Sequence, residues 1–390
     1  MKVFGSSILT IAATSLLATA AQASGFGTEG INPGGALFND KTLVMQGAFS
    51  YALPERNYIN AANTGFGHAT LTSANTNAAN SFFLMSGDIK FAVNDELDCA
   101  FRAHKPFQND TTADSNWIGA TYGLSTVISS LAFDGTCSYK FDVGDGYRMR
   151  LIGGVTSTDL EITRSSVIDL GTAMVTPGAN SGDINTYAIE GQRVLGYRLG
   201  AAFEIPEYAL RAQIIYDSER SISLSGSQTI NGKVVAPANV SLTLPKSIAA
   251  RVQTGINNTT LVYGGFRWTE WSVIQSLSVT GGTPVSVPTG YNDGWDVEVG
   301  FQKKLTKDLS GSASVSWAKG IGGGYNDTWG LSAGIAYDLD DNWRVSLGAS
   351  AKYLTASTGE GGSLGGAVVT YDQADDWAYA VGVRLQYAID

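Results

Sequence analysis

Charged residues and the side chains of common active sites are scarce in this chain. Asp, Glu, Lys and Arg make up 15% of its 390 residues, below the roughly 25% of a typical soluble domain. A formal net charge of −10 argues against nucleic acid as a partner. The two histidines, His68 and His104, stand in no Ser-His-Asp context and at no metal-ligand spacing. We therefore predict a protein that is not an enzyme, with no catalytic residue, metal site or cofactor.

Long apolar runs are equally scarce. Beyond the N-terminus no stretch reaches the roughly 18 consecutive apolar residues of a membrane-spanning helix. The N-terminus itself has Lys2, an apolar stretch from Ile8 to Ala20, and the small-x-small sequence Ala21-Gln22-Ala23. A single membrane anchor is the alternative, but this apolar run is shorter than the roughly 20 residues that a spanning helix needs. We predict a signal peptide at residues 1–23 that is removed after export.

The chain has instead apolar residues at every second position, the pattern of β-strands with two different faces. Three such stretches carry an aromatic residue at both ends of the apolar face: Trp329 with Tyr337, Trp343 with Tyr353, and Trp377 with Tyr387. About ten residues of a tilted strand span roughly 25 Å, the height of the apolar band between the aromatic girdles of an outer-membrane barrel. A soluble β-sandwich would also alternate, but it has no reason to repeat this aromatic spacing.

The alternation predicts 14 strands, and short turns alternate with long connections between them, as in outer-membrane barrels. We predict an all-β fold in the outer membrane, a 14-stranded antiparallel transmembrane β-barrel over residues 42–390 with both chain ends in the periplasm. The predicted strands are 42–53, 81–92, 97–106, 128–141, 147–163, 184–205, 209–225, 243–256, 260–275, 292–304, 310–319, 327–338, 343–355 and 375–387. The predicted long loops lie near 54–80, 107–127, 164–183, 226–242, 276–291, 320–326 and 356–374.

The chain has only two cysteines, Cys99 and Cys137. Outside the cytoplasm such a pair favours a disulfide, with two unpaired thiols as the alternative. Both cysteines lie near the periplasmic ends of neighbouring predicted strands. We expect a cross-strand disulfide without a redox role.

Short motifs along most of the mature chain resemble those of the outer-membrane long-chain fatty acid and aromatic hydrocarbon transporters, the FadL/TodX type. The resemblance rests on Asn32-Pro33-Gly34-Gly35-Ala36-Leu37, Pro106-Phe107 with Trp117-Ile118-Gly119 and Tyr122, Ser138-Tyr139-Lys140-Phe141, Thr163-Arg164 with Asp169-Leu170-Gly171, Leu244-Pro245, Trp268-Thr269-Glu270-Trp271-Ser272, and Asp340-Asp341-Asn342-Trp343. Each motif is weak alone, and their shared order carries the resemblance.

The resemblance implies a monomeric barrel whose lumen holds an N-terminal plug, or hatch, here the short segment 24–41. Asn32, Pro33 and Gly34 are its candidate residues, because Pro fixes φ and Gly permits unusual dihedral angles. An ordinary turn before the first strand is the alternative. Gly34 departs from the family motif, which has Ala at this position.

The resemblance also implies that a hydrophobic ligand is captured by external loops, moves to a lumenal site and leaves through a lateral opening in the wall. We expect long-chain fatty acid as the ligand, with Arg164 at its carboxylate because Arg offers a planar pair of donors. Trp117, Tyr122 and Leu170 are the candidate apolar contacts in the loops. Arg164 binding lipopolysaccharide or a loop carboxylate, and loops that only pack on one another, remain the alternatives.

Three other functions remain open at this stage. Aromatic or alkane hydrocarbons are a second ligand class, and outer-membrane lipid is expected around the wall in every case. A general porin with a water-filled lumen would conduct ions steadily. A structural or adhesive barrel would neither conduct ions nor bind an amphiphile.

Overall fold

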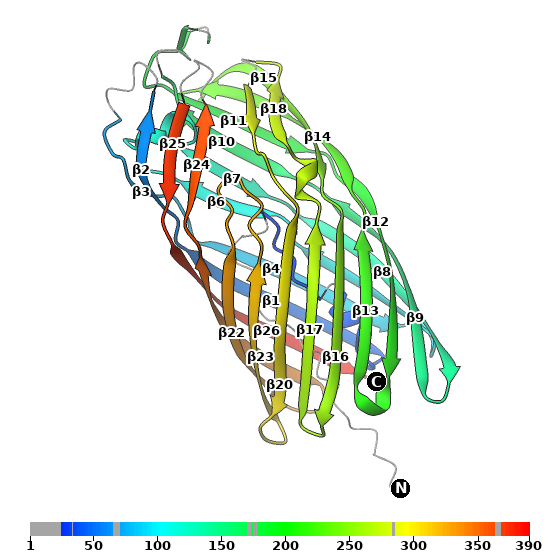
Figure 1. The fold of residues 1–390 in the computed structure, drawn as a ribbon. Helices are drawn as coiled ribbons and strands as arrows, with labels where there is room; N and C mark the ends of the chain where they lie inside the picture. Colours follow the sequence, from blue (N-terminus) through cyan, green and yellow to red (C-terminus); the bar gives the residue numbers. More distant parts are fainter. Residues whose placement is uncertain are drawn as a thin grey trace.

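The computed structural model describes residues 25–32, 34–64, 71–169, 173–174, 176, 178–282, 285–362 and 368–390. Fourteen antiparallel strands close into a barrel in the order β1-β26-β23-β22-β21-β20-β17-β16-β13-β12-β9-β8-β5-β4 (Figure 1). This confirms the predicted fold class. The predicted signal peptide, residues 1–23, lies outside the described residues. Within them, no helix is both long enough and apolar enough to cross a membrane.

Each predicted strand overlaps one strand of the barrel wall. The wall strands are β1 (Leu43–Pro54), β4 (Phe82–Ala92), β5 (Leu97–His104), β8 (Ala132–Gly144), β9 (Tyr147–Thr158), β12 (Val194–Ile205), β13 (Leu210–Asp217), β16 (Ser247–Asn257), β17 (Thr260–Thr269), β20 (Gly294–Lys304), β21 (Leu309–Ala318), β22 (Thr328–Asp338), β23 (Trp343–Leu354) and β26 (Asp376–Ile389).

Two further sheets extend the wall at the end opposite the short turns (Figure 1). One contains β6 (Gln108–Thr112), β7 (Ser125–Ser129), β10 (Glu161–Val167), β11 (Ile184–Gly191), β14 (Arg220–Ile230), β15 (Lys233–Leu244), β18 (Ser276–Thr280) and β19 (Val285–Pro288). The other contains β2 (Asn57–Asn63), β3 (Thr76–Asn77), β24 (Ser357–Gly362) and β25 (Val368–Gln373). Short 3-10 helices are η1 (Gly35–Phe38), η2 (Ile118–Thr121), η3 (Pro206–Tyr208) and η4 (Trp271–Val273).

These external sheets correct the sequence prediction in the long connections. The predicted loop 226–242 is wrong, because it contains the hairpin between β14 and β15. Asn231 and Gly232 form the turn with φ angles of 48° and 79°, as Asn-Gly pairs favour. The predicted strands 184–205 and 209–225 each contain two strands, one in the wall and one in an external sheet.

The two faces of the wall differ as the alternation predicts. Large apolar side chains such as Phe49, Leu331 and Leu347 are exposed on the outer face, where lipid would cover them. Aromatic residues on this face meet across strands: Trp343 lies 4.8 Å from Tyr387 near the short turns, and Tyr353 lies 5.4 Å from Trp377 at the other end, measured between ring centroids. The lumenal face instead carries most of the buried charged residues.

The predicted disulfide is present. Cys99 of β5 and Cys137 of β8 are register partners with Cα atoms 4.0 Å apart, and their sulfur atoms are bonded. Both side chains lie on the outer face, and Cys99 is two residues from the start of β5. The bond closes a loop with a sequence separation of 38 residues, so it lowers the entropy of the unfolded chain.

We expect the double variant Cys99→Ser/Cys137→Ser to lose roughly 3–4 kcal/mol of unfolding free energy, the amount that closing a loop of this length contributes. Urea unfolding of the folded barrel in detergent measures the loss. Adding a reductant should destabilise the wild type and leave the double variant unchanged. Equal unfolding free energies for the two proteins would show that the cross-link contributes nothing.

Candidate functional site

The N-terminal segment, residues 25–42 apart from Pro33, lies inside the barrel before β1 begins. The Thr28 N–H donates a hydrogen bond of 2.9 Å to the Pro106 carbonyl, and the Gln108 N–H donates one of 2.9 Å to the Phe26 carbonyl. The segment therefore pairs, as a short extra strand, with the stretch of chain that follows β5.

The same stretch leaves a gap in the wall, which we call the wall break. β4 pairs with β1 as far as Phe82, but with β5 only as far as Ser86, opposite His104. The next bridge outward joins Ala79 to Thr111. Between these two points the fully described residues of β4 have no ladder partner on the β5 side.

Pro106 explains why the ladder stops here. Proline has no N–H to donate to a neighbouring strand, and the chain turns inward at this residue to pair with the N-terminal segment. A cavity of about 130 Å³ lies on the lumenal side of the wall break, and Leu84, Met85 and Lys105 are among its lining residues. Met85 is a residue of the wall whose side chain is on the outer face and 57% exposed. Because Met85 also lines the cavity, the cavity extends into the wall.

An apolar groove of about 990 Å³ lies on the outer face beside the wall break. Gly47 and Gly87 are direct register partners and form part of its floor. The absence of side chains there leaves the groove deep, and Phe101 and Phe133 are among its apolar borders. The groove shares lining residues with the 130 Å³ cavity, so the two hollows lie on opposite sides of one strip of wall.

Glu29 holds the N-terminal segment across the lumen. Its carboxylate lies 3.0 Å from Arg267 Nη1 on β17, 3.4 Å from Arg102 Nη1 and 3.3 Å from His104 Nδ1 on β5. Burial opposes ionisation of Glu29, but these three neighbours outweigh it and hold its pKa well below the usual range. β5 and β17 are separated by five strands on one side of the ring and seven on the other. One carboxylate therefore ties together nearly opposite walls.

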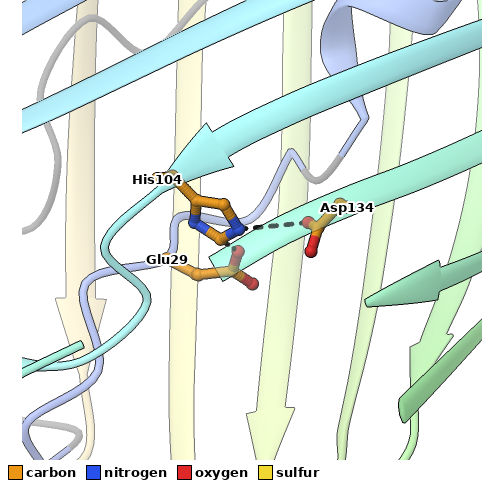
Figure 2. Close-up of side chains that lie close together, drawn as sticks. All are labelled: Glu29, His104 and Asp134. Atoms are coloured by element: carbon orange, nitrogen blue, oxygen red, sulfur yellow. Dashed lines mark hydrogen bonds and ion pairs between the residues drawn. The ribbon is translucent and has the colours of Figure 1, made fainter. Parts of the chain in front are cut away.

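The cluster of Glu29, His104 and Asp134 has the composition of a metal site (Figure 2), and its potential ligand atoms all lie within 4.8 Å of one another. Its geometry favours hydrogen bonding instead. His104 contacts Glu29 through Nδ1 and Asp134 through Nε2, at 3.3 Å and 3.1 Å. Both ring nitrogens thus face carboxylates, and Arg198 Nη1 lies 3.5 Å from Asp134. The cluster works as an ion-pair network that positions Glu29.

Deeper in the lumen, the rest of the N-terminal segment packs against arginine side chains of the wall. The centroid of the Phe38 ring lies 4.2 Å from the Arg211 guanidinium and 5.3 Å from that of Arg150, within cation–π distance of each. The Gln213 side chain donates a hydrogen bond of 3.2 Å to Asn32. These contacts fill the middle of the barrel with the N-terminal segment.

Toward the external side, an aromatic column rises from the N-terminal segment. The Phe26 ring lies 4.7 Å from that of Trp271, which lies 6.4 Å from Tyr291, which lies 5.8 Å from Tyr325. All four belong to, or pack on, one large buried apolar cluster under the external sheets. A Cβ on Gly25 would lie 2.7 Å from the Trp271 ring, so this glycine permits the close packing.

Two arginines lie at the outer end of this column. The Arg56 guanidinium is 5.2 Å from the Tyr325 ring, and that of Arg164 on β10 is 5.0 Å from the Tyr122 ring. Arg164 Nη2 also donates a hydrogen bond of 2.6 Å to the Tyr122 carbonyl. In the described part of the chain no carboxylate lies within ion-pair distance of either arginine.

Tyrosine hydroxyls lie around these two arginines. Burial raises the pKa of Tyr291, Tyr325 and Tyr371, and the charges of Arg56 and Arg164 only partly oppose it. The phenols therefore stay protonated at neutral pH and can donate hydrogen bonds. We call Arg56, Arg164 and the tyrosines around them the mouth cluster: Tyr58, Tyr122, Tyr291, Tyr325 and Tyr371.

Of the sequence-predicted contacts, Arg164, Tyr122 and Trp117 lie in or behind the mouth cluster. Tyr122 is half-buried against Arg164. Trp117 is 2% exposed and stacks on Tyr58 with ring centroids 5.4 Å apart, so it packs behind the cluster. Leu170 and Pro33 lie outside the described residues. Asn32 and Gly34 lie in the N-terminal segment, where Gly34 has a φ of 72°, a conformation that its lack of a Cβ permits.

Sequence reasoning missed several residues that the structure places at the centre of the path. Glu29 stands in an irregular segment where no periodicity marks it. Arg56 lies between β1 and β2, within the predicted loop 54–80. Phe107 and Trp271 belong to the quoted motifs, but only the fold brings both against Phe26, at 6.2 Å from each other.

Comparison with known protein families shows which family the chain belongs to. The sequence model of the family described as outer membrane protein transport protein (OMPP1/FadL/TodX) matches residues 10–363. The chain belongs to this family. Family membership and the barrel fold together place the protein in the outer membrane as a transport protein. No curated protein sequence matches the chain.

Solved structures of the family share the fold at low sequence identity. A Pseudomonas aeruginosa FadL homologue is similar with a TM-score of 0.81 and 17% identity over 95% of this chain and 98% of that one. The Ralstonia pickettii toluene transporter TbuX has a TM-score of 0.65 and 12% identity over 95% and 100%. The Pseudomonas putida toluene transporter TodX has a TM-score of 0.62 and 12% identity over 92% of each chain.

We expect Phe26→Ala to loosen the N-terminal segment and raise ion conductance. Phe26 is 5% exposed between Phe107 and Trp271, and truncating such a buried ring costs roughly 3–5 kcal/mol. Single-channel recording in a planar bilayer measures the effect. The control is Phe49→Ala, which removes a ring from the outer face. Equal conductance in the wild type and Phe26→Ala would show that Phe26 does not hold the segment.

Proposed function

We propose that this protein takes up long-chain fatty acids passively across the outer membrane. One observation carries the proposal: Arg164 has no carboxylate partner in the described part of the chain, and it stands where the aromatic column meets the external loops. A cation in an apolar, phenol-lined setting suits a molecule with one carboxylate and a long alkyl tail.

The mouth cluster is the proposed capture site. A carboxylate there would accept charge-assisted hydrogen bonds from Arg164, with phenol donors beside it. The tail would lie along the apolar cluster that includes Trp271 and Tyr291, because each buried methylene contributes about 0.8 kcal/mol. Tyr122 and Leu170 are proposed contacts, and Trp117 supports Tyr58 from behind.

The N-terminal segment is the proposed hatch. Its contacts with Arg267, Arg102 and Arg211 run across the lumen, and the cavities around Glu29 have volumes of about 130, 70 and 50 Å³. A steady aqueous channel needs a continuous lumen, so this filling argues against a general porin. Asn32, Pro33 and Gly34 would lie in the moving part.

The wall break is the proposed lateral exit. It lies next to the N-terminal segment on the inside and next to an apolar groove on the outside. A fatty acid that leaves there passes from the lumen to the lipid without crossing water. The protein would work as a monomer, because every step uses one barrel, and the signal peptide at residues 1–23 would direct it there.

Monoaromatic hydrocarbons are the second candidate ligands. The solved structures of toluene transporters share this fold, and the aromatic column would accept such a ring. Arg164 and Arg56 favour the acid, because a hydrocarbon leaves both cations without a counter-charge.

We expect Arg164→Gln to weaken oleate binding at least about tenfold, since a hydrogen bond to a charged group contributes roughly 1.5–3 kcal/mol. Binding of oleyl alcohol, which lacks the charge, should change little. Calorimetry in a short-chain detergent measures both. The matched control is Arg193→Gln, an external arginine that is already paired with Asp159 at 2.7 Å. Unchanged oleate affinity in Arg164→Gln would remove Arg164 from the site.

We expect Ser86→Trp to block uptake while leaving oleate capture intact. Ser86 faces the cavity at the wall break, where an indole would fill the route to the lipid. Uptake of labelled oleate by cells should fall to the level of cells without the protein. Ser332→Trp is the control, because Ser332 lines the 70 Å³ cavity away from the break. Equal uptake by the two variants would exclude this exit.

A further inference from the structure

The smaller external sheet presents a row of three polar residues to the interior. In this sheet β24, β25 and β2 lie side by side (Figure 1). Gln373 of β25 is the register partner of Tyr58 on β2 and of Ser357 on β24, so the three side chains share one face. That face is the inner one, because Gln373 is 2% exposed and Tyr58 stacks on the buried Trp117.

Two atoms of this row have no hydrogen-bond partner in the described part of the chain, although both are buried: Gln373 Oε1 and Ser357 Oγ. Buried polar atoms are nearly always paired in native proteins, because an unpaired atom loses its hydration without compensation. An amide oxygen accepts hydrogen bonds, whereas a hydroxyl group both donates and accepts them. A ligand group that donates to Gln373 and exchanges a hydrogen bond with Ser357 would satisfy both atoms, and an alcohol can do so.

The loop of residues 322–324 leaves the amide oxygen uncovered. It consists of three glycines, whose φ angles are 84°, 61° and 87°, a conformation that glycine adopts without strain. A Cβ on Gly324 would lie 3.9 Å from Gln373 Oε1 and 4.0 Å from Tyr371 Oη. The loop therefore comes close to the unpaired oxygen without a side chain that would cover it.

Strand β24 connects this row with Arg164. Its inner face continues from Ser357 to Gly361. A Cβ on Gly361 would lie 2.3 Å from the Tyr122 ring, and the Arg164 guanidinium is 5.0 Å from the centroid of that ring. Arg164 thus lies toward the Gly361 end of β24, and Gln373 lies at the Ser357 end. Four residues of a strand cover roughly 13 Å.

This spacing indicates where along an alkyl chain the alcohol would be. A residue has three backbone bonds and covers at most about 3.3–3.6 Å, so an extended chain advances roughly 1.2 Å per bond. A length of roughly 13 Å therefore corresponds to about eleven bonds. Counted from a carboxylate at Arg164, that is the middle of a long-chain fatty acid.

We propose that the mouth cluster is selective for long-chain acids that carry a hydroxyl group at mid-chain. The carboxylate lies at Arg164, the chain follows the inner face of β24, and the hydroxyl donates to Gln373 Oε1 beside Ser357. Beyond the hydroxyl the tail meets Tyr325, which lies 5.8 Å from Tyr291 in the aromatic column. The inference rests on the proposed function and adds to it a class of substrate, the hydroxy fatty acids.

Isomers of hydroxystearate test the proposal, with stearate as the parent compound. They carry the hydroxyl next to the carboxylate, at mid-chain or at the end of the tail. We expect the mid-chain isomer to bind roughly two- to tenfold more tightly than stearate, the net gain of neutral hydrogen bonds. The other two isomers should bind no more tightly than stearate. Calorimetry in a short-chain detergent measures all four affinities.

Variants connect the gain to the row. In Gln373→Leu the mid-chain isomer should lose its advantage over stearate, while stearate itself should bind as it does to the wild type. Ser357→Ala should lose part of the advantage. The matched control is Gln192→Leu, which changes an exposed glutamine outside the mouth cluster and should keep the whole advantage. Circular dichroism checks that each variant is folded.

The mid-chain methyl ether tests the direction of the hydrogen bond. It keeps the oxygen but has no proton to donate, so it should not share the gain of the alcohol. An ether that binds as tightly as the alcohol would show that Gln373 does not accept a hydrogen bond from the ligand.

The results separate this inference from the proposed function. If no isomer binds more tightly than stearate, if the best isomer is not the mid-chain one, or if the advantage survives in Gln373→Leu, the hydroxyl site is wrong. Stearate binding that still depends on Arg164 would then leave the proposed function standing. If the mid-chain isomer binds through Gln373 while stearate and oleate do not bind, the hydroxyl site stands and uptake of unsubstituted fatty acids fails.

Discussion

The structure depends on one constraint: in the hydrocarbon of a membrane, every backbone N–H and C=O must find its hydrogen bond within the protein. Closing fourteen strands into a ring meets it almost everywhere. The ladder between β4 and β5 stops at His104, and beyond it the Pro106 carbonyl accepts from Thr28 and the Gln108 N–H donates to Phe26 instead. The wall break and the docking of the N-terminal segment are therefore one event. The segment supplies the partners that the inward turn lost at the wall.

Most charged residues of the barrel interior are paired with one another. The lumen holds buried arginines in an acidic protein, and most find carboxylates on neighbouring strands, as Arg150 does with Asp98 and Glu204. Such networks are tolerated in a closed lumen because each ion is paired and hydrogen-bonded. Among the described residues Arg164, Arg56 and Arg384 have no carboxylate within ion-pair distance, and neither have Arg211 and Arg220, which bond to neutral side chains. Arg164 and Arg56 stand at the outer end of the apolar path, and Arg384 lines the cavity at the wall break.

Alternation was enough to predict all fourteen wall strands, because period two is a local property of a strand with one lipid-facing side. The Cys99–Cys137 pair also needed the export signal, which favours oxidation of two cysteines on neighbouring strands. The external sheets were missed although Asn231-Gly232 marked a hairpin, since their exposed faces carry Ser and Thr where the wall strands carry large apolar residues. The pairing of Glu29 with Arg267 joins positions 238 residues apart in sequence. No local pattern encodes such a contact, so only the closed barrel reveals it.

The cross-link between β5 and β8 also constrains assembly. In a barrel, slipping one strand by a single residue turns every lipid-facing side chain inward and every lumenal charge outward. Cys99 and Cys137 are covalently joined in the native register, so an oxidised chain cannot make that error between these two strands. β5 is also the strand whose ladder with β4 ends at His104, where the wall break begins, so its register is fixed on the β8 side at the point where support on the β4 side stops.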